Sequence, residues 1–146
     1  MRHLRLDLLI AVVSILVSCS SGPKPETTRD TNPYERIQAI PPADAKKYRE
    51  VEDYRRWRNP YLIIRADGVG LLDPANLEEH ILKPEELAQA LGKLPASAWP
   101  YGRVVAVTEI GLRASGDDVL IRKNRGIVLG TLEGMHVLVS IGPPPG

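Results

Sequence analysis

The side chains best suited to proton transfer are two histidines, His80 and His136, and three carboxylates, Glu109, Asp117 and Asp118. A carboxylate beside an imidazole can act as a general base or acid, so a small hydrolase that uses Glu109 or Asp118 with a histidine is one hypothesis. The aspartate pair also has a structural explanation, because acidic residues are typical of the first turn of a helix. We expect His80 to be exposed at a helix end and His136 to start a strand, half-buried.

No pattern of metal ligands or of an activated nucleophile accompanies these residues. The histidines lack H-x-x-x-H and H-E-x-x-H spacing, and a chain with a single cysteine, Cys19, cannot build a cysteine-based zinc cluster. There is no G-x-S-x-G elbow, and the G-x-G at residues 68–70 lacks the third glycine of a dinucleotide site. The leading interpretation is therefore a non-catalytic protein with no metal, no cofactor and no small-molecule ligand.

A short aromatic loop at residues 99–103 is the candidate partner-binding surface. It carries Trp99, Tyr101 and Arg103 directly before a predicted strand, and these residue types are enriched in binding hot spots. The alternative is that Trp99 closes the edge of the core. That alternative has weight because the chain contains two Trp, five Tyr and no Phe.

The first nineteen residues have the pattern of an export signal. Arg2 and Arg5 precede an apolar run at residues 8–17, and small residues follow. As a helix, ten residues reach about 15 Å, half of a ~30 Å hydrocarbon core, which disfavours a membrane-spanning anchor. The four residues Leu16-Val17-Ser18-Cys19 resemble the lipobox of bacterial lipoproteins. The resemblance implies that residues 1–18 are removed as a signal peptide and that Cys19 is acylated. An ordinary secreted protein with an unpaired thiol is the alternative.

Charge and anchor together predict where the protein works. There are 19 Lys and Arg against 18 Asp and Glu, so the basic excess expected of a nucleic-acid binder is missing. The lipobox resemblance implies attachment to a membrane through Cys19 in the cell envelope. In a cell with two membranes, Ser20 after the cysteine implies the periplasmic face of the outer membrane. The expected partner is another envelope protein or a second copy of the chain.

Composition divides the remaining chain into four parts. Residues 19–42 are rich in proline and poor in apolar side chains, which predicts a disordered tether after the lipidated cysteine. Residues 43–58 predict a charged helix, which either lies on lipid or a partner, or docks its Tyr, Val and Trp edge on the domain. Residues 59–142 predict a compact domain, and residues 143–146 a proline-rich tail.

Within the domain, hydrophobic periodicity predicts a small α/β fold of the two-layer α+β type. The expected order is β-β-α-β-α-β, with helices on one face of a mixed sheet and a parallel pair formed by the last two strands. A short helical turn at 77–82, opened by an Asn76–Glu79 capping box, is expected after the first hairpin. The expected main elements are strands at 61–65 and 69–72, a helix from 84 to 94, a strand at 103–108, a helix at 117–135 and a strand at 136–141.

The segment from 117 to 135 is ambiguous. Its apolar residues fit one helical face better than an alternating strand, but Gly126, Gly130 and Gly134 each weaken a helix. A two-stranded meander that turns near Asn124 is therefore kept as the alternative. The four-residue glycine spacing predicts close packing of a helix on the sheet.

Three stretches of the domain resemble the periplasmic domain of the ExbD/TolR biopolymer-transport family. They are Leu-Ile-Ile-Arg-Ala-Asp-Gly at 62–68, Pro-Glu-Glu-Leu-Ala at 84–88 and Tyr-Gly-Arg-Val-Val at 101–105. The likeness covers at most residues 60–142, and it implies a small envelope domain that dimerises and contacts other proteins or the cell wall. An accessory role in a transport complex is the corresponding alternative function. The family's transmembrane helix with its functional Asp has no counterpart, and in that family the third stretch opens a helix rather than a strand.

Overall fold

A mixed sheet in the order β3-β2-β1-β4-β5 forms the centre of the protein. The computed structural model describes residues 32–73, 78–111 and 116–142. β1 pairs antiparallel with β2 and parallel with β4, β3 is antiparallel to β2, and β5 is parallel to β4. The strands are β1 (Tyr61–Ile64), β2 (Val69–Leu72), β3 (Glu79–Leu82), β4 (Val104–Glu109) and β5 (Leu138–Ile141).

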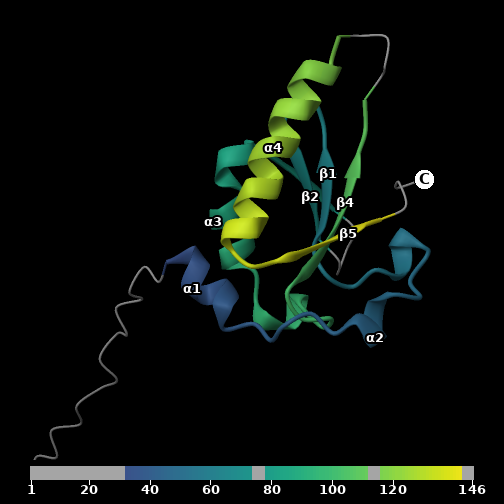
Figure 1. Ribbon diagram of the computed structural model, residues 1–146, viewed down its shortest axis with the longest axis vertical. Coiled ribbons are helices and arrows are strands. Elements are labelled where there is room, and N and C mark those ends of the chain that lie inside the picture. The colour runs from purple at the N-terminus through teal and green to yellow at the C-terminus, as the bar shows by residue number, and fades with distance from the viewer. Residues whose placement is uncertain (1–31, 74–77, 112–115, 143–146) are drawn as a thin grey trace, which may run out of the picture.

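Three helices cover one face of this sheet, as Figure 1 shows. They are α1 (Pro33–Gln38), α3 (Leu87–Lys93) and α4 (Asp118–Gly134). The fourth helix, α2 (Ala45–Tyr48), lies in the segment that covers the opposite face, and short 3-10 turns are η1 (Tyr54–Arg56), η2 (Pro84–Glu86) and η3 (Ala96–Ala98). The predicted two-layer α+β class, with helices on one face and parallel last strands, is confirmed.

The main core lies between the helices and the central strands. Leu62 of β1 and Val105 of β4 meet Leu87 and Leu91 of α3 and Val128 of α4, and all five are fully buried. Burying each such aliphatic side chain contributes about 1.5–3 kcal/mol. β1 and β4 are buried on both faces, which explains their continuous apolar sequences.

The second face of the sheet is covered by residues 43–57, which pack a partly aromatic cluster against it. The prediction that this segment docks its apolar edge on the domain is confirmed, but the prediction of one helix over 43–58 is wrong. α2 ends at Tyr48, and Asp53 accepts a hydrogen bond from the Arg55 N–H at 2.9 Å, which starts η1. Breaking the helix lets Tyr48 and Trp57 both reach the sheet, whereas a straight helix would carry its two ends away from a twisted surface.

Part of the predicted tether is folded. Asn32 caps α1, and Ile37 is 2% exposed in the main core, with Ile40 also buried. Pro33 lies so close to α3 that a Cβ on Gly92 would stand 2.6 Å from the proline ring. A disordered tether through residue 42 is therefore wrong for residues 32–42, because two isoleucines suffice to dock one short helix. Residues 19–31 lie outside the described part of the chain.

Residues 79–82 form a strand, so the predicted helical turn at 77–82 is wrong there. β3 completes the hydrogen bonds of β2, and Glu79 accepts two bonds from the Arg65 guanidinium at 2.9 and 3.0 Å. Pairing across the sheet outweighs the local capping pattern. Asn76 and Leu77, the other residues of that pattern, lie outside the described residues.

α4 is a helix of 17 residues, so the helical interpretation is confirmed and the meander is wrong. Ile121, Val128 and Leu132 face the core. Gly126 and Gly130 face open space instead, so the expectation that these glycines pack closely on the sheet is wrong. Tertiary burial of one face holds the helix despite its poor intrinsic propensity.

Candidate functional site

The side chains of the predicted binding loop, residues 99–103, contact the rest of the domain. Trp99 is 3% exposed in the main core, so the prediction that its side chain meets a partner is wrong and the core-closing alternative is confirmed. The Tyr101 hydroxyl donates to the Arg56 carbonyl at 3.2 Å, and Arg103 donates to Gln38 of α1. These side chains hold the N-terminal segment on the domain.

Asn59 is the residue that fixes this loop, and sequence reasoning missed it. Its side-chain amide donates to the carbonyls of Gly102 and Val104, each at 2.7 Å, and its oxygen accepts the Tyr101 N–H at 2.9 Å. A fully buried asparagine with three backbone partners has a structural role, which here is to hold the loop against the start of β1. The only sequence signal was its place before Pro60, which predicted a helix stop.

The carboxylates of the hydrolase hypothesis do come together, but no histidine joins them. Glu109 and Asp118 line one small depression. His136 follows the far end of α4, about 25 Å away along the helix axis. His80 lies on β3, three strands from β4, which is about 14 Å. The hydrolase set is therefore not assembled.

Both histidines are exposed, and both have a different local structure from the one predicted. His80 is exposed as expected, but within β3 rather than at a helix end. His136 has φ 53° and stands just beyond α4, where the Val137 N–H reaches back to the Leu132 carbonyl at 2.9 Å. This left-handed residue ends the helix; it neither starts a strand nor is half-buried.

Within the described residues, no three His, Cys, Asp or Glu side chains converge closely enough to hold a metal ion. The same residues contain no helix with the length and hydropathy needed to cross a membrane. Cys19, the predicted lipidation site, and the tail at 143–146 lie outside the described residues.

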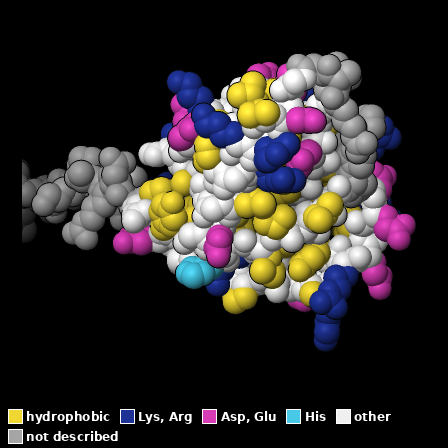
Figure 2. Space-filling view, turned by 45° about the horizontal axis from the view of Figure 1, so that its top comes forward, with side chains coloured by type: hydrophobic (Ala, Val, Ile, Leu, Met, Phe, Trp, Pro, Cys, Tyr) yellow, Lys and Arg dark blue, Asp and Glu magenta, His cyan; other side chains and the backbone are white. Residues whose placement is uncertain are grey.

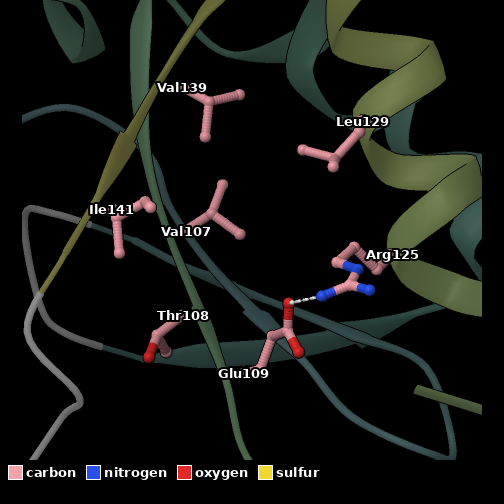
Figure 3. A pocket seen from close by; sticks show the side chains of 7 residues that line it. All are labelled: Val107, Thr108, Glu109, Arg125, Leu129, Val139 and Ile141. Carbon is pink, nitrogen blue, oxygen red and sulfur yellow. Dashed lines mark hydrogen bonds and ion pairs between the residues drawn. The ribbon is translucent and has the colours of Figure 1, made fainter. Parts of the chain in front are cut away.

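A groove of about 650 Å³ opens between α4 and the carboxyl ends of β4 and β5. Figure 3 shows Leu129 of α4 pointing toward Val107, Val139 and Ile141 of the two strands. At one end Arg125 of α4 donates to the Glu109 carboxylate at 3.2 Å. The lining is completed by Thr108. The groove thus has an apolar body and a charged end, which is the usual make-up of a binding cleft.

β5 borders this groove and is the outer strand of the sheet. Its apolar side chains are unusually exposed: Leu138 is 56%, Val139 41% and Ile141 92% accessible. Figure 2 shows hydrophobic side chains collected on one face of the molecule among charged ones. Scattered exposed aliphatics are common, but Val139 and Ile141 share one face of an outer strand, and exposed apolar edge strands are sites of interaction.

The backbone of β5 shows which groups are free to pair. The Leu138 N–H donates to Arg103 and the Gly142 N–H donates to Val107, both toward β4. In a parallel pair, alternate residues turn their N–H and C=O to opposite sides. Val139 and Ile141 therefore direct these groups away from β4, and no strand in the described part of the chain lies beyond them.

Comparison with known proteins gives no relative: no family model, curated protein or solved structure matches the chain. The chemistry of the β5 edge is therefore inferred from its geometry. Unpaired backbone groups beside an apolar groove can add an extended strand, with main-chain bonds for affinity and side-chain pockets for selectivity. Sequence reasoning predicted the strand at 136–141, but only the sheet order reveals that it is an edge.

Proposed function

We propose that the protein is a lipid-anchored envelope protein whose domain is a non-catalytic docking module. β5 and the adjacent groove, lined by Leu129, Val139 and Ile141, take an extended segment of a partner protein as an added strand. The observation that carries the proposal is the outward direction of the Val139 and Ile141 backbone groups beside an apolar groove. Strand addition uses such an edge directly.

The membrane attachment in this proposal rests on the lipobox resemblance at residues 16–19. Acylation at Cys19 would hold the domain at the membrane without a spanning helix, since two or more acyl chains anchor firmly. In the native host, mass spectrometry of the mature N-terminus should find a modified Cys19 as the first residue. A Cys19→Ser protein from which residues 1–18 are still removed, and which still sediments with membranes, would contradict the anchor.

Proline scanning of the two sheet edges tests the docking surface. Val139→Pro removes an N–H that points away from the sheet, so the fold should survive while strand addition loses a bond. Ile81→Pro is the matched control, because Ile81 occupies the corresponding outward position on β3. Chemical crosslinking in intact cells should give adducts with the native and Ile81→Pro proteins, and at least tenfold less with Val139→Pro.

Equal adduct yields for both variants, with unchanged thermal midpoints, would overturn the docking surface.

An accessory role in a transport complex is a narrower form of the same proposal. It rests on the three stretches that resemble the ExbD/TolR domain, although β4 begins at Val104 within the third stretch, where that family has a helix. Loss of a transport activity on gene deletion would be the result expected from it.

A further inference from the structure

We infer that the segment added to β5 is β5 of a second copy, antiparallel and related by a two-fold axis at Ser140. This inference rests on the proposed docking function of the β5 edge and names its partner.

The free backbone groups select one register. If Val139 of one copy faces Ile141 of the other, each pair exchanges two N–H···O=C bonds, which gives four bonds around the axis. A register centred on Val139 brings Ile141 opposite Val137, whose N–H is already bonded to Leu132. A register centred on Ile141 brings Val139 opposite Pro143, which has no N–H. The register centred on Ser140 is therefore the one of the three in which every outward N–H and C=O of Val139 and Ile141 finds a partner.

The same register pairs apolar side chains with apolar side chains. Val139 of each copy stands across from Ile141 of the other on the helix-covered face, next to Leu129. Leu138 faces Gly142 on the opposite face, where glycine leaves it room. None of the residues from 138 to 142 is charged, so the axis brings no like charges together. The strand is complementary to itself, as an isologous interface requires.

Pairing β5 with β3 of another copy is disfavoured by symmetry and by charge. Such a contact is heterologous, so it would not close as a pair but continue into a ring or an open chain of molecules. The β3 edge also carries the Glu79–Arg65 ion pair, and Glu79 is one of its outward residues. Inward-turned or edge charges are a common defence against such pairing.

The predicted dimer is weak. A strand of four residues buries less than the roughly 1,600 Å² of a standard interface. We therefore expect a dissociation constant on the order of micromolar or higher, as for other small interfaces. Confinement to a membrane surface raises the local concentration and favours the pair.

Cysteine crosslinking tests the register directly in the full-length chain carrying Cys19→Ser. At the non-hydrogen-bonded pair on the axis, the two Cα atoms of residue 140 would stand about 4.5 Å apart, within disulfide reach. The two copies of residue 139 would be about 8 Å apart, beyond it. Under mild oxidation, Ser140→Cys should give at least tenfold more disulfide dimer than Val139→Cys. Mixing Val139→Cys with Ile141→Cys should restore the crosslink.

Equal yields from Ser140→Cys and Val139→Cys would overturn the register. The absence of dimer from Ser140→Cys at protein concentrations up to 1 mM (about a thousand times micromolar) would overturn self-pairing altogether. If Val139→Pro abolishes cellular adducts while Ser140→Cys gives no dimer, docking at β5 holds and its partner is a different protein. If Val139→Pro changes no adduct, the docking function itself fails.

Discussion

The two outer strands of the sheet, β3 and β5, differ in how their exposed edges are protected against pairing with another strand. Each leaves a row of backbone groups without a neighbouring strand in the described structure. β3 has a glutamate, Glu79, bound to Arg65, and an adjacent histidine, His80. β5 has Leu138, Val139, Ser140 and Ile141, and none of them is charged.

This difference separates a protected edge from one available for pairing. Charge on an edge strand opposes pairing because an added strand would remove water from the ionised groups. Exposed aliphatics have the opposite effect, since covering them is favourable by about 25 cal/mol per Å². Of the two outer strands, β5 is therefore the one suited to pair with an added strand, and it lies next to α4 and its groove.

The largest expected effect comes from placing a charge on the open edge. Ile141→Lys should lower association at least tenfold, because the ammonium would stand opposite Val139 of the added strand. The free energy of unfolding should change by no more than about 0.5 kcal/mol, since Ile141 is 92% exposed. Analytical ultracentrifugation over a concentration series measures the association.

Ile81→Lys is the control for that change, because Ile81 is also an exposed isoleucine, 52% accessible, on the other outer strand. It should leave association unchanged. An equal loss of association from both substitutions would erase the distinction between the edges.

A smaller effect is expected from the outer face of α4, and it separates stability from association. Gly126→Ala and Gly130→Ala should each stabilise the protein by about 0.5–1 kcal/mol, because alanine favours the helix and the new Cβ meets open space. Thermal unfolding should show the gain, while association through β5 stays the same. A gain in stability accompanied by weaker association would place the glycines at the interface and enlarge it beyond the strand.

The smallest effect concerns Tyr61 on β1, midway between the two edges. Burial raises the pKa of the Tyr61 phenol above its usual value, the Thr108 hydrogen bond opposes that rise, and Tyr54 adds to it. The unfolded tyrosine therefore ionises first, and its contribution to stability is full below pH 10 and declines as pH rises further. Tyr61→Phe should flatten the fall in unfolding midpoint between pH 9 and about 11. An unchanged slope would assign the alkaline sensitivity to other groups.

Local patterns predicted the elements whose own apolar side chains form the core. The apolar runs at β1, β2 and β4 and the leucine spacing of α3 all led to the observed structure. α4 was predicted despite its glycines because its buried residues keep helical spacing. These elements are stabilised by the same side chains that signal them.

The elements that were missed depend on partners far away in the sequence. β3 exists because β2 offers it hydrogen bonds and Arg65 binds Glu79, and α1 exists because Ile37 reaches the core beside α3. No local pattern contains that information. The β5 edge was missed for a related reason: whether an apolar strand is central or outer is a property of the sheet order.

The segment from 32 to 57 packs on both sides of the domain: α1 packs on the helix layer, and Trp57 packs on the opposite face of the sheet. A recombinant fragment that begins at residue 59 would therefore lose the contacts that cover both the helix layer and the opposite face of the sheet. The fragment would expose Tyr61 and Ile63, and this apolar surface could cause association that does not involve β5. Fragments intended for biophysical work should start at or before Asn32.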